Sequence, residues 1–239
     1  MAVNSGKTKA VLIFAASIIE DLERRKLHKR FSPLVQLPPF DASVIRKADV
    51  HVFTTESGYN CRNFASLHEV SIHLQKGQSF GERLTNAIEE LANLGYSEIV
   101  MVGRDCPDLE IADIHLAFDR LGDFRLVLGP DHRGGCYLIA IHAADRSELC
   151  SVIWQQDTDR IQLQEIFLGE TFILPVKHDI DSVADIRLLA RTNSKSSFEA
   201  RLLLQELQAS KPQEQPHSYI YLPVDRQRSF WQLPPPLAN

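Results

Sequence analysis

Short apolar runs alternate with amphipathic segments along most of the chain. The runs with the length and character of buried strands are residues 10–15, 49–55, 70–74, 98–103, 124–129 and 136–142. Helical patterns lie between several of them, and a succession of strand, helix and strand favours parallel pairing through right-handed crossovers. The pattern therefore predicts an α/β protein in which a mostly parallel sheet is layered with helices.

Two of the helical patterns have a clear apolar stripe. In residues 80–95 the stripe consists of Leu84, Ile88, Leu91 and Leu94, and Gly95 is placed to end the helix. In residues 111–122 apolar residues recur at helical spacing up to Gly122, which acts as the stop. We expect both helices to turn these stripes toward the sheet.

The C-terminal part departs from this alternation. A charged amphipathic helix is predicted near residues 196–208, and the segment after it is rich in proline and aromatic residues. We expect residues 1–190 to form the main domain and residues 191–239 to form a helix and a tail. The tail would cover its own domain, or contact a partner or a second copy in a homo-oligomer.

Composition narrows the class of protein. The chain has 239 residues, of which 44% are hydrophobic, so it can bury a large core. A formal net charge of -5 argues against nucleic acid as the main partner. No apolar run approaches the roughly 20 residues that cross a bilayer, and the N-terminus lacks the order of a signal peptide. We therefore expect a cytoplasmic protein without a membrane partner.

Candidate chemistry lies at the end of the strand predicted for residues 98–103. Asp105 and Asp108 follow this strand, and ligands of open α/β sheets collect where parallel strands end. Carboxylates there can hold Mg²⁺ or Mn²⁺. Alternatively, Pro107 and Asp108 begin and cap the next helix. Capping is favoured for Asp108, which leaves Asp105 as the candidate ligand.

Two glycine-bearing turns are further candidates. In residues 75–84, backbone N–H groups and Arg83 could meet an anionic or sugar ligand, although Ser79 and Glu82 also form a capping box that needs no ligand. Between two predicted strands, Gly134 and Gly135 permit either a tight turn or close approach of a ligand.

Acidic residues recur before the last helical pattern of the main domain. Ser182 and Asp185 form another capping box, which leaves Asp179 and Asp181 available for a metal ion or a substrate hydroxyl. Cys106 could in principle act as a nucleophile with His132 or His178, but no local signature supports this role. A passive thiol is favoured, and the four cysteines lack the CxxC spacing of a zinc site.

In their order along the chain, these stretches resemble the bacterial arsenosugar-biosynthesis-type glycosyltransferases. These belong to the GT-A nucleotide-diphospho-sugar transferase superfamily, which also contains the molybdenum-cofactor and phospholactate guanylyltransferases. The resemblance spans about residues 70–190. Its main matching positions are Gln75, Gly77, Gly81, Glu82, Arg83, Gly103, Asp105, Cys106, Pro107, Gly129, Pro130, Gly134, Gly135, Tyr137, Trp154, Pro175, Asp179, Asp181, Ser182 and Asp185.

This resemblance implies a three-layer α/β/α sandwich with a nucleotide-sugar cleft at the carboxyl edge of a mostly parallel sheet. It implies a catalytic role for Asp105, Asp179 and Asp181, with Asp105 as the ligand of a divalent cation, Mg²⁺ or Mn²⁺. Asp179 or Asp181 would contact the metal ion or a small-molecule acceptor. The expected nucleotide- and phosphate-binding residues are Arg24, Lys26, Gly77, Gly81, Arg83, Arg133, Gly134 and Gly135.

The chain departs from the group's pattern at two places. Where the group has a phosphate-cradling loop after its first strand, this chain has residues 15–27, in which Arg24, Arg25 and Lys26 keep the cationic charge. Another interpretation is an amphipathic surface helix in place of a deleted loop. Arg133 replaces an aspartate of the group, and Arg104 adds positive charge beside Asp105. These changes favour fixed cations over a metal ion.

The leading hypothesis is a glycosyltransferase-like protein that binds a nucleoside-diphosphate sugar and transfers the sugar to a small acceptor. An alternative is nucleotidyl transfer to a small phosphorylated acceptor. A third hypothesis is a catalytically silent binding or scaffold protein. A continuous helix over residues 15–27, without an anion site beside Asp105, would favour the third.

Overall fold

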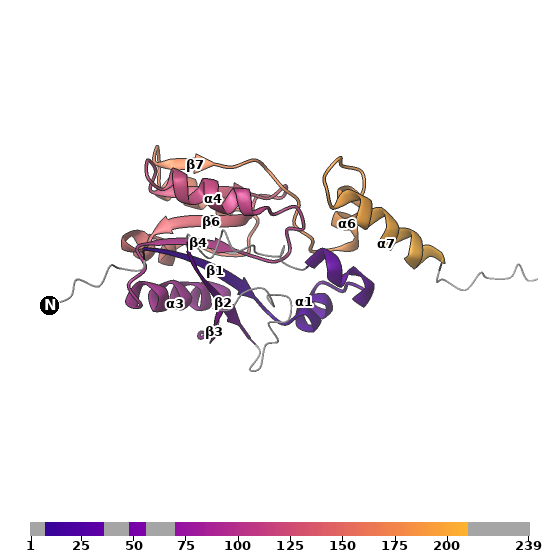
Figure 1. The fold of residues 1–239 in the computed structure, drawn as a ribbon, viewed down its shortest axis with the longest axis horizontal. Coiled ribbons are helices and arrows are strands. Elements are labelled where there is room, and N and C mark those ends of the chain that lie inside the picture. The colour runs from indigo at the N-terminus through magenta and orange to yellow at the C-terminus, as the bar shows by residue number, and fades with distance from the viewer. Residues whose placement is uncertain (1–7, 36–47, 56–69, 210–239) are drawn as a thin grey trace, which may run out of the picture.

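A seven-stranded sheet forms the centre of the computed structural model, which describes residues 8–35, 48–55 and 70–209 (Figure 1). The strand order is β3-β2-β1-β4-β6-β5-β7, and within it only β6 runs antiparallel to its neighbours. The strands are β1 (Lys9–Ala15), β2 (Asp49–Thr54), β3 (Val70–Leu74), β4 (Glu98–Val102), β5 (Leu126–Pro130), β6 (Cys136–His142) and β7 (Thr171–Ile173). The predicted α/β class with a mostly parallel sheet is confirmed.

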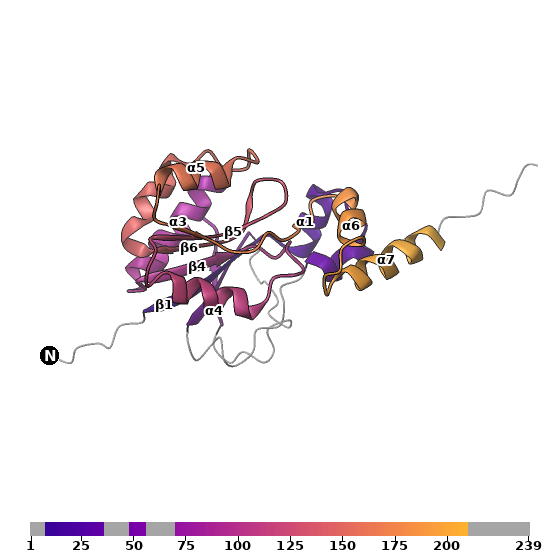
Figure 2. The same cartoon turned by 90° about the horizontal axis from the view of Figure 1, so that it is seen from above.

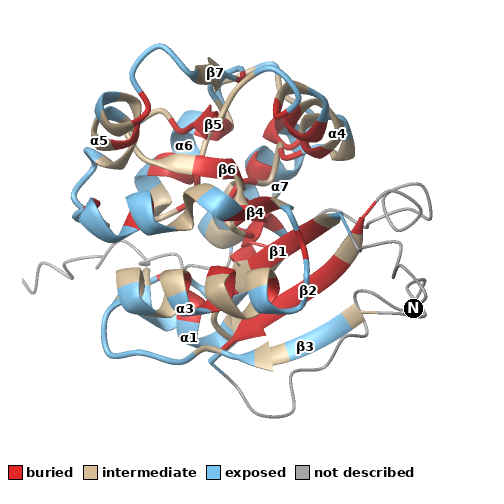
Figure 3. Ribbon diagram, turned by 90° about the vertical axis from the view of Figure 1, so that its left-hand side faces the viewer, coloured by how far each residue is buried: buried red, intermediate tan, exposed pale blue. Residues whose placement is uncertain are grey.

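The middle of the sheet is buried on both faces. Ile13 of β1 is paired with Val52 of β2 and Val102 of β4, and all three side chains are buried. Figure 3 shows the buried central strands and the more exposed edge strand β3. The predicted strand runs are all present. Residues 171–173 form a further strand, β7, which is too short and too exposed for a periodic pattern to reveal.

Helices cover both faces of the sheet, which gives three layers (Figures 1 and 2). Alternate residues of β1 point to opposite faces, so Leu12 packs with α3 (Phe80–Asn93) and Ile13 packs in the cluster that contains α4 (Ile111–Arg120). Helix α5 (Asp159–Ile166) and the 3-10 segment η3 (Ala143–Ser151) lie on the α3 side. A strand buried on both faces explains the continuous apolar run of β1.

Two predictions about helix ends were wrong. Leu94 follows the last residue of α3, and its side chain is 51% exposed, so it does not continue the buried stripe. Helix α4 begins at Ile111, and its N-terminal capping is provided by Glu110 and Asp113 rather than by Asp108. The Asp108 carboxylate instead accepts a hydrogen bond from the backbone N–H of Ser196 at 3.1 Å. The capping box of Ser79 with Glu82 is confirmed.

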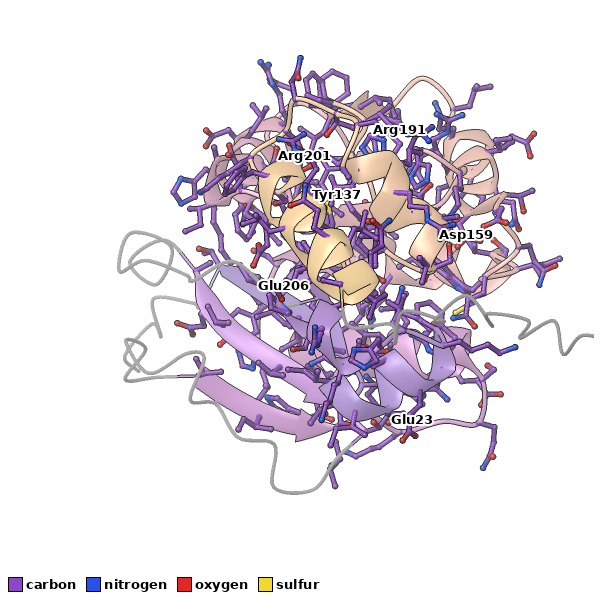
Figure 4. All side chains as sticks on the ribbon, turned by 90° about the vertical axis from the view of Figure 1, so that its right-hand side faces the viewer. Glu23, Tyr137, Asp159, Arg191, Arg201 and Glu206 are labelled. Carbon is purple, nitrogen blue, oxygen red and sulfur yellow. The ribbon has the colours of Figure 1, made fainter. Side chains whose placement is uncertain are left out.

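A small helical unit lies beyond the carboxyl ends of the strands. It comprises α1 (Ile18–Arg24), the 3-10 segment η1 (Lys29–Val35), α6 (Val183–Leu189) and α7 (Ser197–Ala209). Their apolar side chains share one cluster: Leu22, Leu27, Phe31, Leu34, Val35, Ile180, Ile186, Leu189 and Ala200. Figures 1 and 2 show this unit at one end of the molecule, and in Figure 4 it faces the viewer. It joins the start of the chain to the segment that follows β7.

Helix α7 confirms the amphipathic helix predicted near residues 196–208. The proline- and aromatic-rich tail, residues 210–239, lies outside the described residues, so its contact with the domain or with a partner stays a prediction. Within the described ranges, no helix combines the length and the apolar character that crossing a bilayer requires.

Candidate functional site

Connections from several strands meet at the carboxyl edge of the sheet. The segment after β4 and the segment after β7 are joined by a hydrogen bond from the Ile180 N–H to the Asp105 carbonyl, at 2.8 Å. The segment after β7 is also tied to the end of β5, because the Lys177 N–H donates to the Pro130 carbonyl at 3.1 Å. These backbone contacts bring Asp105, Asp179 and Asp181 to one place, where a ligand of an open α/β sheet is expected.

Arg25, at the C-terminal end of α1, reaches into this group of aspartates. Its Nη2 donates to Asp105 Oδ2 at 2.7 Å, and its Nη1 donates to the Ile180 carbonyl at 2.5 Å. Nη1 also contacts Asp181 Oδ1. The side chain of Arg25 is only 7% exposed, so its charge is compensated inside the protein rather than by water.

Arg133 approaches the same site from the turn between β5 and β6. Its guanidinium contacts Asp181 Oδ2, so both carboxylate oxygens of Asp181 are engaged by arginines. The turn itself is closed by Asp131, whose Oδ1 accepts the backbone N–H groups of Arg133, Gly134 and Gly135 at 2.6, 2.8 and 3.0 Å. We call Asp105, Asp179, Asp181, Arg25 and Arg133 the aspartate–arginine cluster.

Asp179 is the most buried carboxylate of the cluster. It is 7% exposed, and its Oδ1 has no hydrogen-bond partner among the described residues. Burial raises the pKa of Asp179, and the charges of Asp105 and Asp131 raise it further, against the lowering effect of Arg25 and Arg133. Asp179 therefore has a carboxylate oxygen without a hydrogen-bond partner, and it binds a proton more tightly than an ordinary aspartate does.

A cavity of about 150 Å³ lies beside the cluster. Asp105 and Asp179 line one part of it, and Phe14, Phe80 and Trp154 line another. The Phe14 and Phe80 rings meet edge to face, with centroids 5.4 Å apart, and Phe80 lies 6.0 Å from Trp154. A second hollow of about 570 Å³ lies on the side of α3 and η3 and shares Phe80 and Trp154 as walls. The two spaces place aromatic surface next to fixed charge.

A divalent cation does not fit the cluster as it stands. One oxygen of Asp105 and both oxygens of Asp181 are already engaged by guanidinium groups. Within the part of the chain that is described, no three His, Cys, Asp or Glu side chains are grouped so that they could hold a metal ion. A doubly charged ion at Asp105 would have to displace Arg25, because the two cations would repel each other in a poorly solvated site.

The segment that follows β1 is a short helix rather than a loop. Helix α1 ends at Arg24, and Lys26 has a φ of 53°, so residues 15–27 are not one continuous helix. Arg24 is 54% exposed and pairs with Asp21 at 2.8 Å, and Lys26 is exposed. Neither makes a contact with Asp105, which is made by Arg25 between them.

Arg104 does not add charge beside Asp105, contrary to expectation. Its side chain is 3% exposed and is paired with Asp21 through two hydrogen bonds, at 2.8 and 3.1 Å. Arg104 thus binds α1 to the end of β4.

The predicted glycines of the site face other parts of the chain. A side chain on Gly81 would meet the Trp154 ring at 2.7 Å, and one on Gly135 would meet Asp131 Oδ2 at 2.5 Å. Gly134 has a φ of 113° and lies against the Asp157 carbonyl, and Gly77 has a φ of 134° beside Glu82. Arg83 donates to the Gln78 carbonyl at 3.3 Å. A ligand role for these residues stays a prediction.

Cys106 is buried at 2% exposure. Burial raises the pKa of its thiol, and the nearby charges of Asp179 and Asp105 raise it further. A neutral thiol at this position is consistent with a passive role.

Sequence reasoning did not single out Arg25, Asp131 or the ring of Phe14. The sequence does mark Arg25 as the central residue of a cationic run. It does not specify which residue of that run faces a neighbouring strand. The sequence also marks Asp131, because an aspartate shortly before two adjacent glycines, here Gly134 and Gly135, is typical of a side chain that closes a turn.

Comparison with known proteins identifies the fold of the chain. Residues 42–156 match a family described as uncharacterized proteins conserved in bacteria (DUF2064), and no curated protein matches the chain. A putative nucleotide-diphospho-sugar transferase from Desulfovibrio desulfuricans G20 is 23% identical over 84% of this chain and 95% of its own, with a TM-score of 0.64.

Two further solved structures are similar at lower identity. Rv0371c from Mycobacterium tuberculosis H37Rv is 16% identical over 79% of this chain and 100% of its own, with a TM-score of 0.53. The 4-diphosphocytidyl-2C-methyl-D-erythritol synthase from Anaerococcus prevotii DSM 20548 is 11% identical over 87% and 99%, with a TM-score of 0.50. The chain therefore has the α/β fold of nucleotide-diphospho-sugar transferases, and this fold, implied by the resemblance noted in the sequence, is confirmed.

Proposed function

We propose that this protein binds a nucleoside-diphosphate sugar at the carboxyl edge of its sheet and transfers the sugar to a small acceptor. The observation that carries the proposal is the position of the aspartate–arginine cluster. Asp105 and Asp179 of the cluster line a cavity that Phe14, Phe80 and Trp154 also line, and Asp181 of the cluster is paired with Arg133. The fold shared with nucleotide-diphospho-sugar transferases supports the same ligand class.

Each part of the site suits one part of such a ligand. The aromatic surface of Phe80 and Trp154 offers a stacking contact for a base. Arg133 is 35% exposed and offers a guanidinium to a phosphate group. Asp179 lines the cavity, has a carboxylate oxygen without a hydrogen-bond partner and has a raised pKa, which suits a general base that takes the proton of an acceptor hydroxyl. No step of this scheme requires a metal ion.

Binding is tested by thermal shift and calorimetry with UDP-, GDP- and TDP-sugars. We expect one of them to raise the unfolding temperature of the wild-type protein, and Arg133→Ala to weaken its binding at least about tenfold, the cost of one charge-assisted contact. Arg191→Ala, which alters an exposed arginine just beyond α6, is the matched control and should bind like the wild type. If none of these sugars shifts the unfolding temperature, the proposal fails.

Transfer is tested by following the products. We expect release of the nucleoside diphosphate, with Asp179→Asn still binding the nucleotide sugar while turning over at least about 10²-fold more slowly, as is typical for loss of a general base. Release of pyrophosphate from a nucleoside triphosphate would instead indicate nucleotidyl transfer. That reaction would use the same cleft.

A second candidate function is binding without catalysis. It is favoured by Arg25, which already compensates Asp105 and Asp181 inside the protein. Such a protein would bind a nucleotide sugar, yet release no product with any acceptor. Binding and product formation measured on the same preparation separate the two functions.

A further inference from the structure

Arg25 stands at the centre of a cluster that would otherwise be strongly negative. The guanidinium of Arg25 contacts Asp105 and Asp181, and the charge of Asp105 also acts on Asp179. The Asp179 oxygen that lacks a partner is buried, and Asp179 is one of the residues that line the cavity. Arg25 thus lies among carboxylates in the way that a bound cation would.

The arrangement is built into the fold. Arg25 follows α1 directly, and Lys26 leaves the helix in a left-handed conformation, which ends α1 at this point. Leu22 and Leu27, on either side of Arg25, are buried in the helical unit. Arg104 binds Asp21 of the same helix from the end of β4. The backbone that carries Arg25 is therefore held by packing and by a buried ion pair.

The charge that Arg25 and Arg133 bring together equals that of one divalent cation. Both arginines contact Asp181, and Arg25 also contacts Asp105. Arginine keeps its charge at every accessible pH and donates from several N–H groups, so it can compensate carboxylates and still offer donors to a phosphate. The Nε of Arg25 is buried, and the described residues provide no acceptor for it.

We propose that Arg25, assisted by Arg133, is a tethered cation that occupies the position of a divalent ion in this cleft. It excludes metal from Asp105, Asp179 and Asp181, and it makes the binding of a diphosphate group independent of metal. The exclusion of metal stands on the cluster alone, whereas the statement about diphosphate rests on the proposed function.

The exclusion is tested with Mn²⁺ alone, titrated into the full chain and followed by calorimetry and by the electron paramagnetic resonance of free Mn²⁺. We expect no uptake by the wild type at millimolar Mn²⁺, and uptake of one ion by Arg25→Ala and by the larger neutral variant Arg25→Met. Adding Asp105→Asn to either variant should weaken Mn²⁺ binding at least about tenfold, because it removes an anionic ligand. Arg25→Lys, which keeps the cation, should take up none.

The matched control is Arg24→Ala, which removes the neighbouring, exposed arginine and should leave the protein without Mn²⁺ uptake. Two results would overturn the exclusion: uptake by the wild type that Asp105→Asn abolishes, or folded Arg25 variants that take up no Mn²⁺. If both neutral variants fail to fold, the wild type and its Asp105→Asn variant still decide the question.

The second measurement uses the nucleotide sugar that gives the largest thermal shift. We expect its affinity for the wild type to be the same within about twofold in EDTA and in Mn²⁺. Loss of binding in EDTA would overturn the metal independence. If no nucleotide sugar binds under either condition, the proposed function fails, whereas the Mn²⁺ titration still tests the tethered cation.

Discussion

At the level of single residues, Asp179 lowers the stability of the folded protein, which is typical of a residue that is kept for function. A buried carboxylate oxygen without a partner destabilises a folded protein, and it persists where it serves another purpose. The raised pKa of Asp179 reflects the same loss of stability. The folded state binds the proton of Asp179 more tightly than the unfolded chain does, so the charged form is disfavoured by folding.

We expect Asp179→Asn to raise the free energy of unfolding at pH 7 by about 1–3 kcal/mol, because the neutral amide avoids the desolvation cost of a buried charge. An acid with a raised folded pKa destabilises the fold above that pKa, and the cost disappears as the pH falls through the folded pKa toward its ordinary value of 3.8. The gap between the variant and the wild type should therefore shrink from pH 7 to pH 4 in urea titrations.

The exposed Asp119→Asn on α4 serves as the control and should show no such gap. A variant less stable than the wild type at pH 7 would mean that Asp179 has a partner that stabilises its charge.

A second feature at the level of single residues is a chain of hydrogen bonds that connects β2, β3 and α3, from Asp49 to Glu90. Tyr96 donates to Asp49 at 2.6 Å, so His51 Nε2 must donate to Tyr96, at 2.9 Å. His51 Nδ1 then accepts from His73 Nε2, at 2.9 Å. His73 Nδ1 contacts Glu90 Oε1 at 2.6 Å, which connects the chain of hydrogen bonds to α3.

Glu90→Gln should destabilise the protein at pH 7 by about 1 kcal/mol, as expected for a partly exposed ion pair. Desolvation acts to raise the pKa of Glu90, but the hydrogen bonds from Lys76 and His73 outweigh it, so the net shift is downward from 4.5. A lowered carboxyl pKa stabilises the fold above the unfolded pKa, and this is lost as the pH falls through the folded pKa. The difference between Glu90→Gln and wild type should therefore shrink as the pH falls below 4.5 in denaturant titrations.

Glu165→Gln, on the exposed face of α5, is the control and should match the wild type throughout. A difference that persists at low pH would show that the side-chain amide, rather than the lost charge, causes the effect.

At the scale of elements, the position of α1 depends on the buried pair of Arg104 and Asp21. Both side chains are at most 5% exposed, and the pair connects α1 to the end of β4. Removing one member of a buried pair leaves an uncompensated charge, whereas replacing both with apolar groups can be neutral.

We expect Arg104→Met to lower the free energy of unfolding by about 3–5 kcal/mol, and the double variant Arg104→Met with Asp21→Leu to recover most of that loss. Urea denaturation of the single and double variants measures both quantities. If the double variant were as unstable as the sum of the two single variants, the pair would not be what holds α1 in place.

At the scale of the whole molecule, the sheet and the helical unit meet at the candidate site. Ile180 is buried in the apolar cluster of the helical unit, and its N–H donates to the Asp105 carbonyl at the end of β4. The cluster draws on segments far apart in the chain, from Phe31 to Ala200. We expect the two parts to unfold together.

Phe31→Ala tests this coupling. Phe31 is fully buried in the helical unit, and its truncation should cost about 3–5 kcal/mol, with one cooperative transition by both circular dichroism and tryptophan fluorescence. Phe198→Ala, at a side chain that is 63% exposed on α7, should change stability by less than about 0.5 kcal/mol. Separate transitions for Phe31→Ala would mean that the helical unit unfolds on its own.

Local patterns in the sequence specify the layered fold and the position at which β4 ends. The continuous apolar run of residues 10–15 requires burial on both faces, and the N-terminal caps at Ser79 and Ser182 fix where two helices begin. These are local signals, because period and capping depend on neighbours within a few residues. For the same reason Asp105 was recognisable as a strand-end carboxylate.

The ion pair of Asp105 with Arg25 depends on tertiary contacts. Helix α1 ends at Arg24 and Lys26 leaves it in a left-handed conformation, so the end and the rotation of α1 select Arg25 from the cationic run. That rotation is set by apolar packing of Leu22 and Leu27. The contacts of Arg25 with Asp105 and Asp181 span 80 and 156 residues, and no local pattern specifies a contact across such distances.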